Sequence, residues 1–206
     1  MKCKRVSKVE LVLEGGQWSG AERAQVEMIA TPLAMQPTGH VIKSWADKPY
    51  GIIKSLTVGT VHDGHTFAVR INWEVPPATS TDFPPAIAFA LPVKAASPLV
   101  LMGTAEAPIH ILHWQGGTQP GVRSVLAKGI GSSNHGPGVG QKALARQDGN
   151  RFSVVITRAL GSGAGAAPLK TGTTTRIGFA AWDGGNEERA GIKSFSVDWL
   201  DLVLAA

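Results

Sequence analysis

The sequence predicts an all-β fold, a single-domain antiparallel β-sandwich that spans residues 1–206. Apolar and polar residues alternate with a period of two in many short segments, which is typical of strands with one buried face. Turn signals rich in Gly, Pro and Asp separate these segments, and no long helical period competes with them. Because the composition does not change along the chain, we expect one domain.

The clearest strand is expected at residues 66–75, where the apolar side chains share one face: Phe67, Val69, Ile71, Trp73 and Val75. The same alternation predicts further strands at residues 9–13, 26–30, 87–93, 109–114, 152–156, 177–181 and 195–203. The turns between them are marked by His62-Asp63-Gly64, Pro84-Pro85, Gly116-Gly117, Asp148-Gly149 and Asp183-Gly184-Gly185. Residues 128–149 are expected to form a long loop, and residues 161–175 a surface excursion.

Composition excludes several classes of protein. The chain is 43% hydrophobic and 17% charged, which allows a sizeable core and excludes disorder and coiled coils. No run of 18 apolar residues is present, so we expect no membrane span. The net charge is +5, but beyond the first ten residues Lys and Arg are scattered singly. We therefore expect no nucleic-acid partner, because binding would need a basic stripe with interleaved aromatics.

The single cysteine, Cys3, excludes an internal disulfide, a four-cysteine iron–sulfur site and a thiolate zinc cage. No C-x-x-C-H motif for covalent haem attachment is present, and the motifs of hydrolases, P-loops and dinucleotide sites are missing. The first residues show no secretory signal. We expect a cytoplasmic protein if Met1 is the native start, with an exported protein whose signal was removed as the alternative.

The histidine pattern does not favour a histidine metal site. His62 and His65 flank a turn, where solvent exposure is the simplest interpretation. His110 and His113 point to opposite faces of one strand, so they cannot bind one ion together. We expect His113 to face inward with its isoleucine neighbours, where it is either a hydrogen-bonded core histidine or a ligand to haem or metal.

Lys193 is the anomaly in the pattern. Its ammonium group shares a strand face with three large apolar residues, Phe195, Val197 and Trp199. Burying that charge unpaired costs several kcal/mol or more, so the side chain must reach out to solvent, pair with a carboxylate or lose its proton. The pattern alone favours the first outcome, because Lys193 begins the run. A neutral amine that binds a metal is the sharper alternative.

Met102 follows the apolar run 98–101 and directly precedes Gly103. Methionine in such a place usually fills a gap in the core. Its thioether is also a soft axial ligand for haem iron, where it raises the reduction potential.

Several segments together resemble the haem-binding gamma subunits of the type II dimethyl sulfoxide reductase family of molybdenum enzymes, which includes ethylbenzene dehydrogenase, dimethylsulfide dehydrogenase, selenate reductase and chlorate reductase. The resemblance is carried by HDGHTFAVRINWE (62–74), FPPAIAFALPV (83–93), PLVLMG (98–103), PIHILHWQ (108–115), FSVVITRAL (152–160) and IGFAAWDGGNEERAGIKSFSVDWLDL (177–202), with WSGAERAQVEM (18–28) as the opening strand. These segments span nearly the whole chain in order.

The resemblance implies a haem b inside the β-sandwich, in a pocket enclosed by its long loops, with Met102 and Lys193 as its axial ligands. A thioether and a neutral amine add no negative charge to the iron, which favours the ferrous state relative to a thiolate site. Side chains expected to line the porphyrin are Phe89, Phe195 and Trp199. Arg158, at the end of its strand, is expected either to pair with a haem propionate or to reach solvent.

By the same resemblance, the chain is expected to be an electron-transfer subunit without catalysis of its own. Its expected partners are a molybdopterin catalytic subunit and an iron–sulfur subunit, in a heterotrimer, and a soluble electron carrier. Two departures from the family stand out. Phe83-Pro84-Pro85 replaces a segment with an acidic residue after the phenylalanine, and the export signal of periplasmic family members is absent, so a periplasmic location remains the alternative.

The rival hypothesis is a haem-free β-sandwich that binds carbohydrate. Surface aromatics such as Trp45 or Trp114 would then stack on sugar rings, and six Trp against one Tyr give this hypothesis some support.

Overall fold

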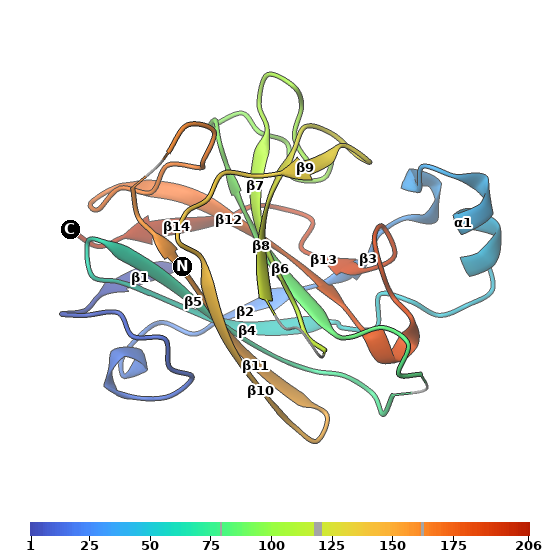
Figure 1. The fold of residues 1–206 in the computed structure, drawn as a ribbon, viewed down its shortest axis with the longest axis horizontal. Coiled ribbons are helices and arrows are strands. Elements are labelled where there is room, and N and C mark those ends of the chain that lie inside the picture. Colours follow the sequence, from blue (N-terminus) through green and yellow to red (C-terminus); the bar gives the residue numbers. More distant parts are fainter. Residues whose placement is uncertain (79, 118–120, 162) are drawn as a thin grey trace.

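The computed structural model describes residues 1–78, 80–117, 121–161 and 163–206, and it confirms an all-β sandwich (Figure 1). One layer contains, in spatial order, β10 (Lys142–Asp148), β11 (Arg151–Ala159), β5 (Thr66–Glu74), β4 (Ser55–His62) and β2 (Ala24–Glu27). The other contains β12 (Thr174–Trp182), β6 (Ala86–Pro92), β7 (Ile109–Gln115), β8 (Gly121–Ala127) and β9 (Ser133–His135).

Two strands join the layers along one side. β1 (Lys2–Arg5) lies parallel to both β4 and β14 (Leu200–Leu204), whereas the other strand pairs are antiparallel. The sheet is therefore mixed, which corrects the purely antiparallel arrangement expected from the sequence. The short strands β3 (Ile29–Ala30) and β13 (Ser194–Phe195) pair with each other beside β12.

Helical structure is limited to short pieces. α1 (Gly39–Trp45) lies at one end of the sandwich (Figure 1), and η1 (Gly16–Trp18), η2 (Leu33–Met35) and η3 (Gly184–Asn186) are single 3-10 turns. Among the described residues no helix is long and apolar enough to cross a bilayer.

Most strands with a clear period of two are confirmed, but the expectation for residues 9–13 is wrong. This segment is irregular, and its apolar side chains pack on the outer face of the first layer around Trp18. That cover explains why the sequence did not indicate β4: with both faces buried, the strand shows no alternation. The segment 128–149, expected to be a loop, contains the strands β9 and β10. The sequence pattern missed them because both are edge strands whose side chains are mostly exposed, so they carry little apolar alternation.

Two further expectations need correction. The strand expected at 195–203 is interrupted at residues 196–199, between β13 and β14. Residues 161–175 are irregular until β12 begins, as expected, but they do not run only over the surface. Apart from Ser162, which lies outside the described residues, the segment buries Ala166, Ala167 and Leu169.

The main core lies between the two layers. Phe67 of β5 and Phe89 of β6 meet edge to face with ring centroids 6.1 Å apart, and Trp73 stacks on Phe152 of β11 at 5.1 Å. These inner faces hold the large apolar side chains, which stabilise the fold by their burial.

The outer face of the second layer is different, because its central strands carry small side chains. Ala88 and Ala90 of β6 are in register with Ala180 and Gly178 of β12. Side chains face outward at alternate positions, so these four residues form a flat surface. This surface positions the candidate site.

Gly103, which follows Met102, has φ of 81° and leaves no room for a side chain. A Cβ there would lie 2.8 Å from the Ala127 carbonyl oxygen and 2.9 Å from the Ile109 amide nitrogen. We expect Gly103→Ala to lower the free energy of unfolding by about 2 kcal/mol or more, measured by urea denaturation. Gly138→Ala is the control, because a Cβ there meets no atom within 4 Å. Equal stability of the two variants would contradict this account of the turn.

Candidate functional site

A cavity of about 570 Å³ lies over the outer face of β7, β8 and β12. Its volume is within the usual range for ligand pockets. Residues that lie far apart in the sequence line it, among them Met102, Ile111, His113, Trp182 and Gly191. The cavity thus adjoins the flat surface of small side chains on β6 and β12.

Met102 is held at the wall of this cavity by a tight turn in the β6–β7 connection. Its backbone is left-handed, with φ of 57°, a conformation that non-glycine residues rarely adopt. Its amide donates to the Leu99 carbonyl at 2.9 Å, and its carbonyl accepts from the Gly129 amide at 3.0 Å. The half-buried thioether packs with Ile111 and Trp199 against the outer face of the second layer.

Lys193 lies beside Trp182. Lys193 does not itself line the cavity, but Trp182 does. The Nζ atom of Lys193 lies 5.9 Å from the centroid of the Trp182 ring. In the part of the chain that the structure describes, no carboxylate forms an ion pair with this amine. The amine is half-buried, and its burial lowers the pKa to about 8.

The expected apolar face shared by Lys193, Phe195, Val197 and Trp199 is corrected by the structure. The chain turns at residues 196–199, and Val197 is 40% exposed. The buried side chains alternate with this set: Ile192, Ser194 and Ser196. Lys193 therefore lies at the outer surface of the second layer and not in the main core.

Phe195 and Trp199 lie on the same outer face as Met102. Phe195 is in register with Ala180, whose side chain points outward. The Trp199 indole donates from Nε1 to the Ser97 carbonyl at 2.9 Å and packs beside Met102. Of the expected lining residues, these two are brought to the side of the sheet that carries the cavity.

Phe89 and Arg158 point the other way. Phe89 is fully buried in the main core, against Phe67. Arg158 is also fully buried, so the alternative in which it reaches solvent is wrong. Its guanidinium donates to the carbonyls of Ala159 at 2.9 Å and Ala167 at 3.0 Å, and the Nη1 atom has no hydrogen-bond partner among the described residues. Pairing of Arg158 with a propionate stays a prediction, and these inner-face contacts do not favour it.

His110, rather than His113, points into the sandwich, and the expected solvent exposure of His62 is wrong, because His62 is fully buried. The Ala167 amide donates to Nδ1 of His110 at 3.3 Å, so the proton is on Nε2, which lies 2.8 Å from the Ser124 hydroxyl. Burial lowers the pKa of His110 to about 4, and the nearby Arg158 adds to the shift. Through these hydrogen bonds the neutral ring connects β7 and β8 to Ala167, in the segment that precedes β12.

His113 lies on the outer face with Ile111, and it lines the cavity. Its ring meets the Trp182 ring edge to face, with centroids 4.9 Å apart. Burial and the charge of Arg123 lower the pKa of His113 to about 4. The expectation that it faces the core is therefore wrong.

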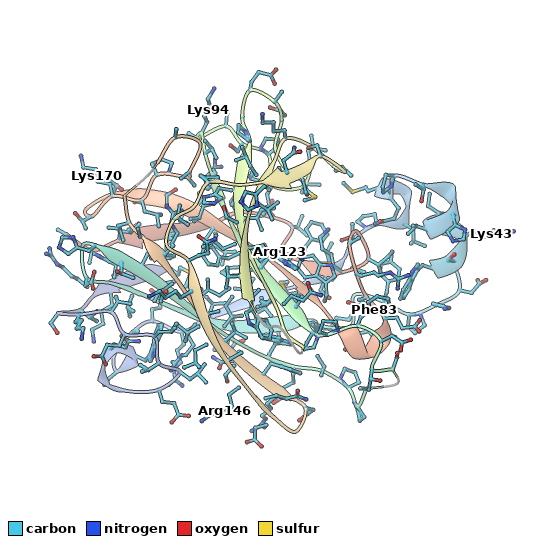
Figure 2. All side chains as sticks on the ribbon, in the orientation of Figure 1. Lys43, Phe83, Lys94, Arg123, Arg146 and Lys170 are labelled. Atoms are coloured by element: carbon cyan, nitrogen blue, oxygen red, sulfur yellow. The ribbon has the colours of Figure 1, made fainter. Side chains whose placement is uncertain are left out.

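Arg123, on β8 (labelled in Figure 2), is a cavity residue that the sequence did not reveal. It is in register with His113, and its Nη2 atom donates to Gln115 at 3.0 Å. It supplies a positive charge at the exposed edge of the cavity. Arg123 lies on a strand that the sequence pattern did not predict. Its place beside the cavity follows only from the register of β8 against β7, which the sequence does not give.

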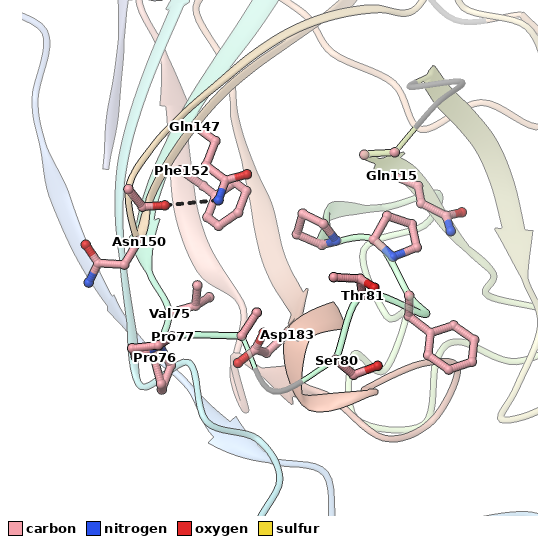
Figure 3. A pocket seen from close by; sticks show the side chains of 18 residues that line it. Val75, Pro76, Pro77, Ser80, Thr81, Gln115, Gln147, Asn150, Phe152 and Asp183 are labelled. Atoms are coloured by element: carbon pink, nitrogen blue, oxygen red, sulfur yellow. Dashed lines mark hydrogen bonds between the residues drawn. The ribbon is translucent and has the colours of Figure 1, made fainter.

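A larger cavity of about 900 Å³ lies elsewhere, where β5, β7 and β12 end and β6 begins (Figure 3). Prolines, side-chain amides and Phe152 line it, and none of the expected haem-site residues does. Its wall includes Phe83-Pro84-Pro85, the segment that departs from the family pattern.

The aromatic residues of the carbohydrate hypothesis are not surface platforms. Trp114 is 4% exposed in the main core, and Trp45 is 9% exposed and packs edge to face on Tyr50. Stacking of either ring on a sugar is therefore contradicted, because neither face is open to solvent.

The shifted pKa of His110 predicts a loss of stability in acid. The folded chain keeps the ring neutral, whereas the unfolded chain binds a proton near pH 6.5. The free energy of unfolding therefore falls as the pH drops from 6.5 towards 4, by about 2 kcal/mol from this residue. We expect His110→Gln to reduce the difference in urea stability between pH 7 and pH 4. His65→Gln, at an exposed turn, should keep the wild-type difference; equal losses in both variants would count against the assignment.

Lys193 should lower the stability of the cofactor-free chain at neutral pH. Its folded pKa lies below the unfolded value, so the penalty is complete below pH 8 and disappears as the pH rises towards about 10.4. We expect Lys193→Met to raise the free energy of unfolding at pH 7 by about 1 to 3 kcal/mol, with the gain vanishing near pH 10. The exposed Lys128→Met provides the comparison in the same urea titrations. A gain that does not depend on pH would refute the argument.

Two curated proteins are similar to the chain. The chlorate reductase subunit gamma of Ideonella dechloratans is 34% identical over 118 residues, which cover 57% of this chain and 48% of that protein. A protein of Haloferax mediterranei, described as a respiratory nitrate reductase heme subunit, is 25% identical over 181 residues, which cover 84% of this chain and 63% of that protein. The alignments thus span about half to two thirds of these relatives. No family model matches the chain.

Among solved structures, a family 9 carbohydrate binding module of Caldicellulosiruptor kristjanssonii has the same fold. Its complex with cellotriose gives a TM-score of 0.56 at 11% identity, covering 100% of this chain and 93% of that chain. Its complex with glucose gives 0.53 at 10% identity, with coverage of 100% and 95%. At this identity the likeness shows the sandwich fold alone. The sequence comparisons go further: the chain is homologous to the chlorate reductase gamma subunit and to the nitrate reductase heme subunit, which confirms its resemblance to the gamma subunits of the type II dimethyl sulfoxide reductase family.

Proposed function

We propose that this chain is a b-type haem electron-transfer subunit, in which Met102 and Lys193 bind the iron at the cavity on the outer face of the second layer. One observation carries the proposal. In a chain homologous to a reductase heme subunit, Met102 lines a cavity, and the uncompensated amine of Lys193 lies 5.9 Å from the ring of Trp182, which lines the same cavity.

The residues at the cavity fit a haem in three respects. The cavity is lined in part by the apolar side chains of Met102, Ile111, Val125 and Trp182, and the sheet beside it is flat because paired positions of β6 and β12 carry Ala and Gly on this face. The donors are a thioether and an amine, which are known haem-iron ligand chemistries when the amine is neutral. Arg123 at the edge of the cavity offers a positive charge to the carboxylates of a haem.

When bound, the haem supplies one-electron storage at its iron. The chain's own residues hold the ligands and prepare them. Lys193 must lose its proton to bind, and its pKa of about 8 leaves about one amine in ten neutral at pH 7, compared with fewer than one in a thousand for an ordinary lysine. The turn at Met102 holds the thioether in place before any ligand arrives, which reduces the ordering cost of binding.

The partners and the role follow from the homologues and belong to the proposal. The printed name of the Ideonella protein makes it a subunit of chlorate reductase. By analogy, this chain relays electrons between an iron–sulfur subunit and a soluble carrier, in a heterotrimer whose molybdopterin subunit carries out the substrate chemistry. The chain itself performs none, and its compartment stays a prediction.

The chain purified after expression with ample haem should show the absorption spectrum of a reduced b-type cytochrome on addition of dithionite. We expect Met102→Ala and Lys193→Ala to lose the six-coordinate low-spin spectrum, because each removes one axial ligand. His113→Ala keeps that spectrum and so separates this assignment from histidine ligation. Unchanged spectra in both ligand variants would refute it. A colourless protein that responds to glycan titration would instead support the carbohydrate hypothesis.

A further inference from the structure

We propose that Glu188 is a positioning residue for Lys193: its buried carboxylate closes a ring of contacts that fixes the backbone from which the lysine amine projects. The inference rests on the proposed function, in which Lys193 binds the iron. Glu188 is not among the described residues that line the cavity, and no sequence pattern had marked it.

The Glu188 carboxylate is 1% exposed and is held by N–H groups. Its Oε1 accepts from the Gly51 amide at 2.7 Å and the Ile52 amide at 3.3 Å, and its Oε2 accepts from the Asp183 amide at 3.1 Å. Asn186 donates to the same Oε1 at 3.3 Å. Hydrogen bonds to a charged acceptor are the stronger kind, and leaving such donors buried without a partner is costly. The carboxylate therefore joins the turn after β12 to residues 51–52.

The second half of the ring runs from Gly51 to Lys193. Gly51 has φ of 62°, and a Cβ there would lie 2.4 Å from Ala30, so the two backbones are in direct contact. The next residue, Thr31, accepts a hydrogen bond from the Tyr50 hydroxyl at 2.8 Å. The Thr31 amide in turn donates to the Lys193 carbonyl at 3.0 Å. The backbone of Lys193 is thus fixed through residues 30–31 and 50–52.

The segment from Glu187 to Lys193 is strained. Glu187 and Ala190 are left-handed, with φ of 60° and 52°. Non-glycine residues keep such conformations only where the surroundings over-determine them. Here the Trp182 indole donates to the Ala190 carbonyl at 3.0 Å, the Gln36 amide donates to the Gly191 carbonyl at 3.0 Å, and Glu188 holds the start of the turn. Without the carboxylate the turn can relax, and Lys193 moves with it.

The first test needs no cofactor. Amide hydrogen exchange is measured by NMR in the haem-free chain for the wild type, Glu188→Ala and Glu187→Gln. The neighbouring Glu187 is the matched control, because its carboxylate makes no hydrogen bond to residues 51–52 in the described structure. We expect Glu188→Ala to speed exchange at least tenfold at Gly51 and Asp183 and also at Thr31, whose amide reports on Lys193. Thr31 exchange within twofold of the wild type would overturn the proposal.

Glu188→Gln keeps the inference testable if the alanine variant does not fold. It retains an acceptor for Gly51 and Ile52 but turns an NH₂ group towards the Asp183 amide. We expect Thr31 exchange to rise about threefold, and an unchanged rate would again overturn the ring. In the haem-loaded chain, Glu188→Ala should weaken haem affinity at least tenfold and convert part of the six-coordinate spectrum to five-coordinate, with Glu187→Gln unchanged. Wild-type affinity and spectrum in Glu188→Ala would contradict it.

The two proposals fail in different experiments. A wild-type chain that binds no haem would refute the proposed function, while the exchange rates would still decide whether Glu188 fixes Lys193. A chain that binds haem through Lys193 but shows unchanged Thr31 exchange in Glu188→Ala would refute only the positioning role.

Discussion

The small side chains on the outward face of β6 and β12 are the constraint on which the candidate site depends. Ala88, Ala90, Gly178 and Ala180 form a flat apolar surface beside the cavity, and the first three are themselves buried. Leu99 closes over Gly178, where a Cβ would lie 2.6 Å from it, and Met102 and Trp199 continue that cover. These four small residues keep the sheet flat beside the cavity, whose walls include Met102, Ile111, His113 and Trp182.

The second layer keeps its two faces chemically separate. The inner face carries large apolar side chains together with His110, which accepts from the Ala167 amide and lies within hydrogen-bond distance of the Ser124 hydroxyl, while Arg158 of the first layer donates to the Ala167 carbonyl. The outer face carries the softer donor Met102 and the amine of Lys193. One strand can contribute to the core and to the cavity wall, because its successive side chains point to opposite sides of the sheet. This division stabilises the sandwich without using the groups that we assign to the cofactor.

Lys193 lowers the stability of the cofactor-free chain, and the same burial prepares its amine for the iron ligation that we propose. Burial disfavours its charged form, and no carboxylate compensates it in the described part of the chain. The same desolvation brings the amine closer to the neutral form that can donate a lone pair. The turn that carries it contains left-handed residues and a buried carboxylate, which is the concentration of strain that functional sites often show.

The sequence by itself determined the fold class, the strands with two unlike faces, such as β5 and β7, and the odd position of Lys193 in its apolar run. The resemblance of its motifs also pointed to Met102. Alternation reports only that a strand has two unlike faces, so it could not tell which face of β7 lies inside, and His110 and His113 were exchanged for this reason. Likewise β4 gave no signal because both of its faces are covered, and the contribution of Arg123 depends on the register of β8 against β7. Only tertiary structure decided that Phe89 and Arg158 lie inside while Met102, Phe195 and Trp199 lie outside, because the packing of one layer on the other assigns each face to core or to cavity.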